Sequence, residues 1–311
     1  MLRFIKDWTL PLAMLLGITG YFCLASFDFL APVRPVAGSL AQTLPPFLIF
    51  AQLLLVFCKV DWRDLLPDKW HAWLLLFQAL ACLAAVGCLL LFPLDAGWRI
   101  AFEGMMVCFI CPTATAAAVV TGKLGGNAAS LTVYTLLSNL LAAIMVPLFF
   151  PLVEPSSVSF GAAFFRILGK VFPLLLFPFF IALLLRKFFP VVHRFLTSLK
   201  DAAFYLWAVA LTIVMGQTAR SMVEGNTGFS EELLIASLSL VVCCIQFYVG
   251  KRIGSAYHDR ISAGQALGQK NSVLAIWMAC TYLNPVSAVA PGSYALWQNI
   301  INSYQLLKKR R

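Results

Sequence analysis

The amino-acid sequence predicts an all-α membrane protein of ten transmembrane helices, arranged as two inverted repeats of five. Three observations lead to this prediction: the composition, the spacing of the apolar runs and the placement of the charges. The 311-residue chain is 61% hydrophobic and 12% charged, with a mean hydropathy of +0.87. A water-soluble domain has about 25% charged and about 45–50% apolar residues. The composition therefore excludes a sizeable soluble catalytic domain, a nucleic-acid-binding domain and a disordered tail.

Apolar runs separated by charged or turn-rich segments give ten predicted spans, each close to the roughly 20 residues that cross a bilayer. The predicted spans are 8–26, 38–58, 70–93, 98–121, 127–152, 162–185, 202–221, 232–250, 261–282 and 286–307. The first resembles a signal peptide in position. Its apolar part is long for one and no small-residue cleavage motif follows, so we interpret it as a span.

The charges follow this topology and account for the net charge of +10 without a nucleic-acid partner. Seventeen of the 23 Lys and Arg residues fall in the termini and loops of one side. The opposite side holds Arg34, Arg99, Arg166 and Arg220, and Lys170 and Lys270 lie within spans. Basic loops remain in the cytoplasm, so we expect both termini there. The short loops and the lack of a targeting extension favour a bacterial inner membrane.

Both halves of the chain contain a matching interruption. Repeat one covers about 7–152 and repeat two about 162–307, and five spans per half make the second half enter the membrane from the opposite side. The fourth span of each repeat is interrupted, at 111–115 and at 264–271, where proline or glycine weakens a helix. Such breaks are tolerated only where they face protein or water. Paired breaks at matching positions predict the substrate site of a transporter.

Lys270 places a cation near the middle of the ninth predicted span. A charge there costs about 2.5–3.5 kcal/mol, and neither membrane surface is within easy reach of the side chain. Glu103, the acidic residue inside a span, has Arg99 four residues before it as its expected partner. Lys270 therefore binds an anionic substrate, contacts the carbonyls at a helix C-terminus, or loses its proton inside the membrane.

The other chemical groups inside the spans are neutral. The nine cysteines are odd in number, and we interpret Cys108 and Cys111 as packing residues, not as a redox or metal site. The sequence has no catalytic motif, so we expect neither an enzyme nor a bound metal. The remaining polar residues inside the spans are concentrated at the two breaks and in the spans that follow them. They are Gln78, Thr113, Thr115, Thr135, Ser138, Asn139, Gln217, Gln246, Asn271, Ser272, Gln298, Asn299 and Asn302.

At both breaks the sequence resembles the bile acid:sodium symporter family. Residues 111–118, CPTATAAA, are similar to the family's crossing motif CPGGTASN. Residues 268–272, GQKNS, stand where the family has an acidic residue followed by GMQN. Pro291-Gly292 and the WQN of 297–299 resemble its P-G and W-H-N ending.

This resemblance implies a panel domain of spans 1, 2, 6 and 7 and a core domain of spans 3–5 and 8–10. The broken spans 4 and 9 would cross in the core, and substrate would bind between the domains during alternating access. With the breaks themselves, the resemblance predicts as substrate-binding residues Thr113, Thr115, Lys270, Asn271, Gln298 and Asn299. The ion-site positions that keep an oxygen ligand are Gln78, Thr135 and Asn139.

The sequence departs from the family at other ion-site positions. Ala117 and Ala118 replace its Ser-Asn pair, Ala266 replaces the acidic residue, and Lys270 replaces the ion-site glutamine. An ammonium about 4 Å from Na⁺ repels it by about 4 kcal/mol at an effective dielectric of 20. We therefore expect Lys270 to take the place of the ion. Transport would then be independent of sodium, either as a uniporter or driven by protonation of Lys270.

The main prediction is a secondary transporter of a small organic anion, with the lipid bilayer as its other partner and no cofactor. Three alternatives remain: a sensor or binding protein that keeps the transporter fold without flux, a sodium symporter with a single residual site, and a membrane enzyme that uses Lys270 in a Schiff base. The sequence makes no prediction of the oligomeric state.

Overall fold

The computed structural model describes residues 2–60, 66–154, 157–199, 201–225 and 228–310, and within these residues the regular structure is helical. The helices are α1 (Leu2–Ser26), η1 (Asp28–Val33), α2 (Arg34–Phe57), α3 (Lys69–Leu91), α4 (Ala96–Ile110), α5 (Ala117–Leu124), α6 (Ala128–Val153), α7 (Phe160–Phe188), α8 (Pro190–Ser198), α9 (Ala202–Glu224), α10 (Phe229–Ser255), α11 (Arg260–Gly268), α12 (Ser272–Tyr282), η3 (Pro285–Ala288) and α13 (Val289–Arg310). The predicted all-α class is confirmed for this part of the chain.

Six of these helical segments are long and apolar enough to cross a membrane: Asp28–Phe57, Lys69–Leu91, Ala128–Val153, Phe160–Phe188, Ala202–Glu224 and Phe229–Ser255. The protein is therefore an integral membrane protein. Shorter apolar helices occupy Pro11–Ser26 and Ser272–Tyr282. Two of the ten predicted spans are each divided between two helices that are too short to cross alone, α4 with α5 and α11 with α12. The count of ten stays a prediction.

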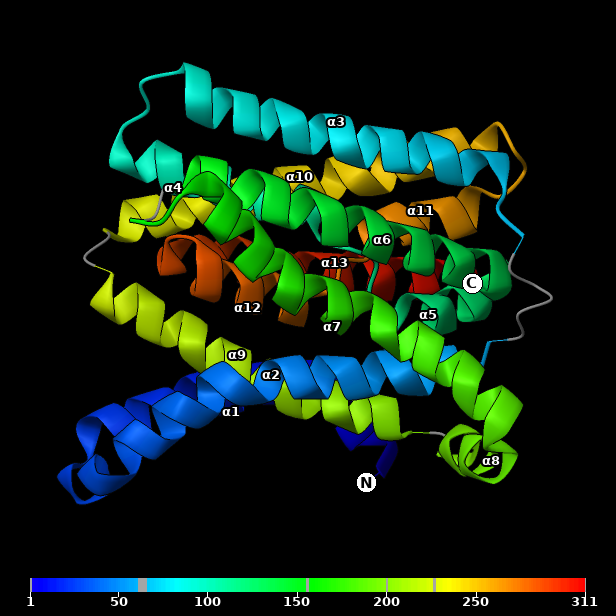
Figure 1. The fold of residues 1–311 in the computed structure, drawn as a ribbon, viewed down its shortest axis with the longest axis horizontal. Coiled ribbons are helices and arrows are strands. Elements are labelled where there is room, and N and C mark those ends of the chain that lie inside the picture. Colours follow the sequence, from blue (N-terminus) through cyan, green and yellow to red (C-terminus); the bar gives the residue numbers. More distant parts are fainter. Residues whose placement is uncertain (1, 61–65, 155–156, 200, 226–227, 311) are drawn as a thin grey trace.

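The helices lie side by side along the long axis of the molecule, and their connections gather at its two ends (Figure 1). One end holds the start of α3, the short helices α5 and α8, the turn from α10 to α11, and the C-terminus. Most of the basic loops predicted for one side fall at this end. Arg63, Lys200 and Arg311 belong to the same predicted set but lie outside the described residues.

Several helices begin where the sequence supplies a residue that caps the free backbone N–H groups of the first turn. Asp95, Asn127, Ser159 and Asn271 each accept a hydrogen bond from the backbone of the residue three positions later. Gly125 follows the last residue of α5 at φ 85°, in the left-handed region that glycine adopts without strain. Local sequence therefore sets these boundaries.

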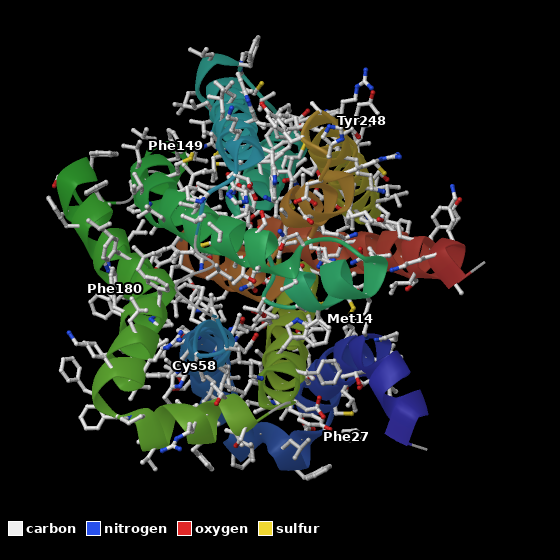
Figure 2. The ribbon with its side chains drawn as sticks, turned by 90° about the vertical axis from the view of Figure 1, so that its right-hand side faces the viewer. Met14, Phe27, Cys58, Phe149, Phe180 and Tyr248 are labelled. Atoms are coloured by element: carbon white, nitrogen blue, oxygen red, sulfur yellow. The ribbon has the colours of Figure 1, made fainter. Side chains whose placement is uncertain are left out.

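The helices pack in two groups, which are joined by an extensive contact between α6 and α7. α9 packs against α1 and α2, and α2 packs against α7. In the other group, α4 packs against α3, α10 and α13, and α11 packs against α10 and α6. Helix α12 touches both groups, with contacts to α2 and α9 on one side and α4 and α13 on the other. Exposed apolar side chains such as Phe180 and Tyr248 lie on the outside of the bundle, where lipid would surround them (Figure 2).

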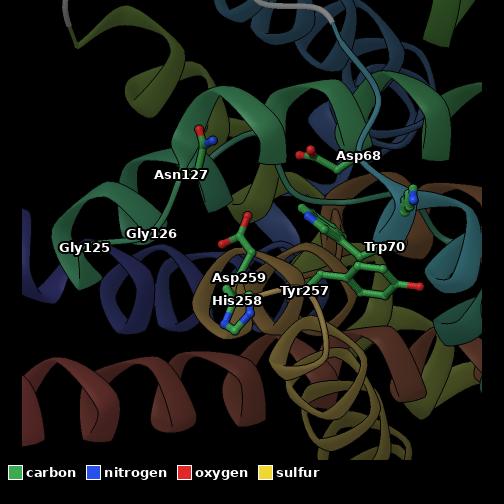
Figure 3. Close-up of a pocket in the computed structure, with 9 residues that line it drawn as sticks. Asp68, Trp70, Gly125, Gly126, Asn127, Tyr257, His258 and Asp259 are labelled. Carbon is green, nitrogen blue, oxygen red and sulfur yellow. The ribbon is translucent and has the colours of Figure 1, made fainter.

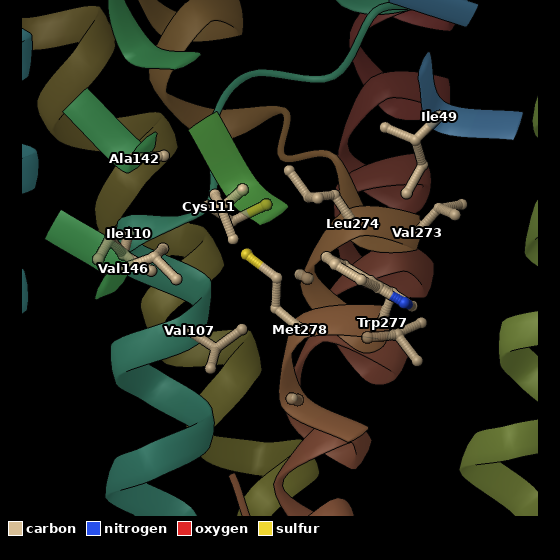
Figure 4. Packing of buried hydrophobic residues seen from close by; sticks show 14 of the residues in the cluster. Ile49, Val107, Ile110, Cys111, Ala142, Val146, Val273, Leu274, Trp277 and Met278 are labelled. Carbon is tan, nitrogen blue, oxygen red and sulfur yellow. The ribbon is translucent and has the colours of Figure 1, made fainter. Parts of the chain in front are cut away.

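The interior next to α12 is tightly filled with apolar side chains. Leu274 and Met278 of α12 lie against Val107 and Cys111, in and just after α4 (Figure 4). The cluster continues through Ile49 of α2 and Val146 of α6. Because α12 lies inside the bundle, its 11 residues need not reach either membrane surface.

The structure corrects the predicted position of the second break. Residues 264–268, which we expected to be interrupted, belong to α11, and only residues 269–271 leave the helix. The glycines of this region serve close packing. A Cβ atom on Gly268 would overlap the Phe247 ring of α10, and one on Gly250 would overlap the backbone of Ala263. The first break runs from 111 to 116 and agrees with the prediction.

Candidate functional site

The two breaks lie side by side and pair through their backbones. Thr113 and Lys270 form an isolated antiparallel bridge. The N–H of Ala114 donates to the carbonyl of Gln269 at 2.9 Å, and the N–H of Asn271 donates to the carbonyl of Pro112 at 2.9 Å. The bridge satisfies polar backbone groups that each broken helix would otherwise leave unpaired. The structure thus brings Thr113, Lys270 and Asn271 into one place. We call this place, formed by residues 111–116 and 269–271, the crossing.

Lys270 lies inside the protein, with 2% of its surface exposed. Its Nζ donates to the carbonyl of Phe109, in the last turn of α4, at 3.3 Å. This is the contact with a helix C-terminus that the sequence offered as one of three possibilities, and the partial negative charge of that terminus favours a cation. The carboxylate of Glu103 is paired with Arg99 at 3.6 Å and so does not serve as the counter-ion.

Gln298 of α13 holds the backbone of the second break. Its Oε1 accepts from the N–H of Lys270 at 2.8 Å, and its Nε2 donates to the carbonyl of the same residue at 3.2 Å. The side-chain amide therefore bonds to both the N–H and the carbonyl of Lys270, as the backbone of a neighbouring β-strand would. Asn299 next to it is half-buried, and its Nδ2 donates to Ala295 of its own helix at 2.6 Å. Of these two predicted residues, Gln298 is the one bonded to the crossing.

The remaining predicted substrate residues differ in their surroundings. The Thr113 hydroxyl is buried and donates to the carbonyl of Ala266 at 2.7 Å. The Asn271 side chain accepts from the N–H of Leu274 at 3.2 Å and so begins α12. Thr115 is half-buried in the second part of the first break, beside the exposed Ala116. This part of the first break is the place where the crossing approaches the surface.

The five carbonyls at the end of α4 and the start of the first break all accept hydrogen bonds from distant parts of the chain. The donors are Gln246 Nε2 to Cys108 at 3.2 Å, Lys270 Nζ to Phe109 at 3.3 Å, Gln78 Nε2 to Ile110 at 3.0 Å and to Cys111 at 3.2 Å, and Asn271 N–H to Pro112 at 2.9 Å. Such carbonyls are the oxygen ligands that hard cations bind. In this structure they are occupied by N–H and ammonium donors of the protein.

The positions where the family resemblance implied ion ligands are of two kinds, alanines among apolar side chains and buried polar residues of α6. Ala117 and Ala266 are fully buried in an apolar cluster with Trp70, Leu131 and Tyr134, and Ala118 packs at its edge. Thr135 is buried, and its hydroxyl donates to Leu131 of its own helix at 3.0 Å. Asn139 is 1% exposed, and its Nδ2 has no hydrogen-bond partner among the described residues.

Sequence reasoning missed two buried tyrosines of this site. The Tyr134 hydroxyl donates to Gln78 Oε1 at 3.1 Å. The Tyr294 hydroxyl accepts from Gln246 Nε2 at 3.1 Å and donates to the carbonyl of Gly268 at 2.8 Å. A tyrosine inside a predicted span is itself a signal, because a buried phenol needs a hydrogen-bond partner.

A cavity of about 590 Å³ lies among the start of α3, the turn from α5 to α6 and the turn from α10 to α11 (Figure 3). Asp68, Trp70, Asn127, Tyr257 and Asp259 are among the residues that line it. None of the predicted site residues is in its wall. Within the described residues, no group of His, Cys, Asp and Glu side chains has the arrangement of a metal site.

Comparison with known proteins gives two matches. The sequence profile of the SBF-like CPA transporter family matches residues 61–306. A protein of Bacillus subtilis (strain 168), described as the uncharacterized sodium-dependent transporter YocS, is 28% identical over 253 residues. That alignment covers 78% of this chain and 74% of the Bacillus protein. The family match, over residues 61–306, includes the two breaks and Lys270.

Proposed function

Because this chain belongs to the SBF-like CPA transporter family, we propose that it is a secondary transporter of a small organic anion that works by alternating access. The paired breaks support this proposal, since discontinuous helices with unwound backbone form the substrate sites of many transporters. The substrate-binding residues of the proposal are Thr113, Thr115, Lys270, Asn271, Gln298 and Asn299.

The proposal includes ten spans in two inverted repeats. Two pairs of residues in corresponding spans support it: Gln78 of α3 bonds to Tyr134 of α6, and Gln246 of α10 bonds to Tyr294 of α13. Each pair donates to carbonyls of a broken helix. The contacts of α9 with α1 and α2, and of α2 with α7, support the assignment of these four helices as the panel domain, with α3–α6 and α10–α13 as the core. Helix α7 also joins the panel to α6 of the core. Both termini are proposed to be cytoplasmic, in a bacterial inner membrane.

The sign of the proposed substrate follows from the charges at the crossing. Lys270 supplies a full positive charge, and α5 and α12 begin there, so their N-termini add partial positive charge. A carboxylate would compete with the Phe109 carbonyl for the ammonium. The bond to the Phe109 carbonyl has one charged partner, whereas an ammonium–carboxylate pair has two, so the exchange favours an anion.

We propose further that transport does not require sodium. The observation that carries this is the set of five carbonyls, from Cys108 to Pro112, that accept hydrogen bonds from the protein's own donors. A sodium ion would have to displace the ammonium of Lys270 and the amide of Gln78. The alanines at 117 and 266 supply no replacement oxygen from their side chains.

Thermal unfolding of the purified protein against a panel of small carboxylates tests these proposals, in sodium chloride and in choline chloride. We expect at least one carboxylate to raise Tm equally in both salts. Lys270→Gln should abolish that increase, whereas Lys170→Gln, which removes an exposed lysine of α7, should preserve it. Uptake into proteoliposomes that requires Na⁺ and saturates with it would overturn sodium independence. Stabilisation without flux would indicate a sensor.

The energetic coupling, if any, is tested in the same proteoliposomes. A uniporter would move substrate down its gradient at any pH difference across the membrane. Transport driven by protonation of Lys270 would respond to an imposed pH gradient in the parent and lose that response in Lys270→Gln. Equal pH responses of parent and variant would exclude Lys270 as the proton carrier.

Sodium coupling through a single residual site is the second candidate function. The relative from Bacillus subtilis is named a sodium-dependent transporter. Thr135 and Asn139 are oxygen-bearing side chains buried in α6, and the unsatisfied Nδ2 of Asn139 shows that this region has a polar group without its full set of bonds. Thr135→Ala and Asn139→Ala would remove sodium dependence if this candidate is correct.

A further inference from the structure

Helix α8 has two chemically different faces. Val191, Val192 and Phe195 are exposed apolar residues at helical spacing, with 71%, 45% and 62% of their surfaces accessible. His193, Arg194 and Thr197 lie on the opposite face, and they line a cavity of about 470 Å³. A short helix with an apolar face and a basic face is typical of a segment that lies in the plane of a membrane surface.

The cavity is formed where the ends of three helices meet. Cys58, Lys59 and Val60 follow α2, Arg186 comes from the last turn of α7, and Pro190 begins α8. Lys59, Arg186 and Arg194 bring three basic side chains to its wall, and His193 adds an imidazole. The cavity is therefore suited to an anionic group.

Hydrogen bonds to backbone carbonyls hold these cations in place. Lys59 Nζ donates to Leu199 at 3.1 Å, Arg186 Nη1 to Val60 at 3.4 Å, and Arg194 Nε to Pro190 at 3.3 Å. The bond of Arg194 uses one of the five N–H groups of its guanidinium. The planar guanidinium also matches the geometry of a phosphate.

An apolar surface adjoins the cavity. Phe188 and Phe189 connect α7 to α8 and are 59% and 60% exposed, and Phe180 and Leu184 are exposed further along α7. Helix α7 is one of the segments that can cross the membrane. Its exposed apolar residues, from the cavity toward the middle of the helix, would therefore face the hydrocarbon of the lipids. A soluble anion would occupy the basic cavity and leave the apolar surface unused, whereas a phospholipid would contact both.

We propose that the cavity between α2, α7 and α8 binds the phosphate of an anionic phospholipid whose acyl chains lie on the exposed apolar residues of α7 and α8. Basic pockets between transmembrane helices on the cytoplasmic side bind lipid headgroups in this way. The site is separate from the crossing. The inference depends on membrane insertion and is independent of what the transporter carries.

Native mass spectrometry of the purified full-length protein tests the proposal. The ligands are dioleoyl phosphatidylglycerol, dioleoyl phosphatidylcholine with the same acyl chains, and inorganic phosphate. We expect phosphatidylglycerol to be retained more strongly than phosphatidylcholine. Arg194→Gln should weaken its binding about five-fold, as expected for the loss of one basic group at a membrane surface.

Lys187→Gln is the matched control for Arg194→Gln. It removes the same charge from the neighbouring turn, but its Nζ lies over the Phe188 ring, 5.2 Å from the centroid, and the residue does not line the cavity. We expect this variant to bind phosphatidylglycerol as the parent does. A second variant, Phe195→Ser, changes the apolar face only and should weaken retention of phosphatidylglycerol without affecting inorganic phosphate.

Three results would overturn the proposal. Equal retention of the two phospholipids would show that the headgroup charge is not recognised. Equal losses in Arg194→Gln and Lys187→Gln would show a general effect of net charge. Binding of inorganic phosphate that depends on Arg194, without preference for phosphatidylglycerol, would identify the ligand as a soluble anion. Each result would leave the carboxylate-dependent stabilisation tested at Lys270 unchanged, so the two proposals fail separately.

Discussion

The two broken helices meet at one crossing, but their interruptions have different causes. The first break, from 111 to 116, contains Pro112, which lacks the N–H that donates a regular helical hydrogen bond. Its second half reaches the surface at Ala116. The second break is only three residues long, 269–271, and contains no proline. It lies within a run of buried residues that extends from Ser262 to Ala279.

The difference shows that a break can be imposed by the chain or by its neighbours. Pro112 removes one helical hydrogen bond whatever surrounds it, although α6 and α7 continue through Pro147 and Pro178. In the second break, Lys270 is held by the amide of Gln298 and by the backbone of the first break. The first break is thus defined locally, and the second depends on partners in other helices. The following predictions test this distinction.

Gln298→Met should have the largest effect. It leaves the buried N–H of Lys270 without its partner, and an unsatisfied buried group costs about 1–3 kcal/mol. The carbonyl of Lys270 loses the Gln298 amide but keeps the N–H of Ser272 at 2.9 Å. We expect the free energy of unfolding in mixed micelles to fall by about 1.5–4.5 kcal/mol, from one unsatisfied group and the loss of one net hydrogen bond worth about 0.5–1.5 kcal/mol. Asn299→Leu is the control, because its amide bonds only within α13 among the described contacts. Equal losses in both variants would contradict a specific role for Gln298.

Gly268→Ala should cause the second-largest loss of stability, because the new Cβ at the end of α11 would overlap the Phe247 ring. Overpacking of this kind costs about 1–3 kcal/mol. Gly87→Ala in α3 is the control: a Cβ there meets no heavy atom within 4 Å, so the change should stabilise the helix by about 0.5–1 kcal/mol. Opposite signs in thermal unfolding would support packing as the role of Gly268. Stabilisation by both changes would restore the interpretation of Gly268 as a helix breaker.

Pro112→Ala should have a smaller effect, although it removes the local cause of the first break. The backbone bonds of Ala114 and Asn271 across the crossing do not need the proline ring. We expect a loss of about 0.4–1 kcal/mol, mainly because the unfolded chain gains freedom. Reversible unfolding in the same micelles measures it. A loss larger than that of Gln298→Met would reverse the order of importance of the two breaks.

Replacing sodium with choline should have no effect on the unfolding temperature of the protein without substrate. A resident site occupied at ten times its Kd would contribute about 1.4 kcal/mol of stability that choline could not supply. The carbonyls that could form such a site already accept bonds from Lys270, Gln78 and Asn271. A clear increase of Tm in sodium that disappears in Asn139→Ala would favour the residual sodium site.

The helical class, the burial of Lys270 and the position of the first break were all predictable from the sequence. Each depends on composition or on a residue whose local effect is strong. The second break was placed too early, because glycines were interpreted as helix breakers when Gly264 and Gly268 remain helical. The tyrosine partners Tyr134 and Tyr294 were missed, as was helix α8, whose nine residues fall in a predicted loop.

The sequence by itself determined that this chain inserts into a membrane, that its fourth span is interrupted at Pro112, and that a lysine lies far from either surface. Burial of apolar surface and the missing N–H of proline act within a few residues, so neither requires knowledge of the fold. The tertiary structure alone decided what the lysine contacts. Its Nζ reaches Phe109, 161 positions away in the chain, and only the folded chain brings those two atoms together.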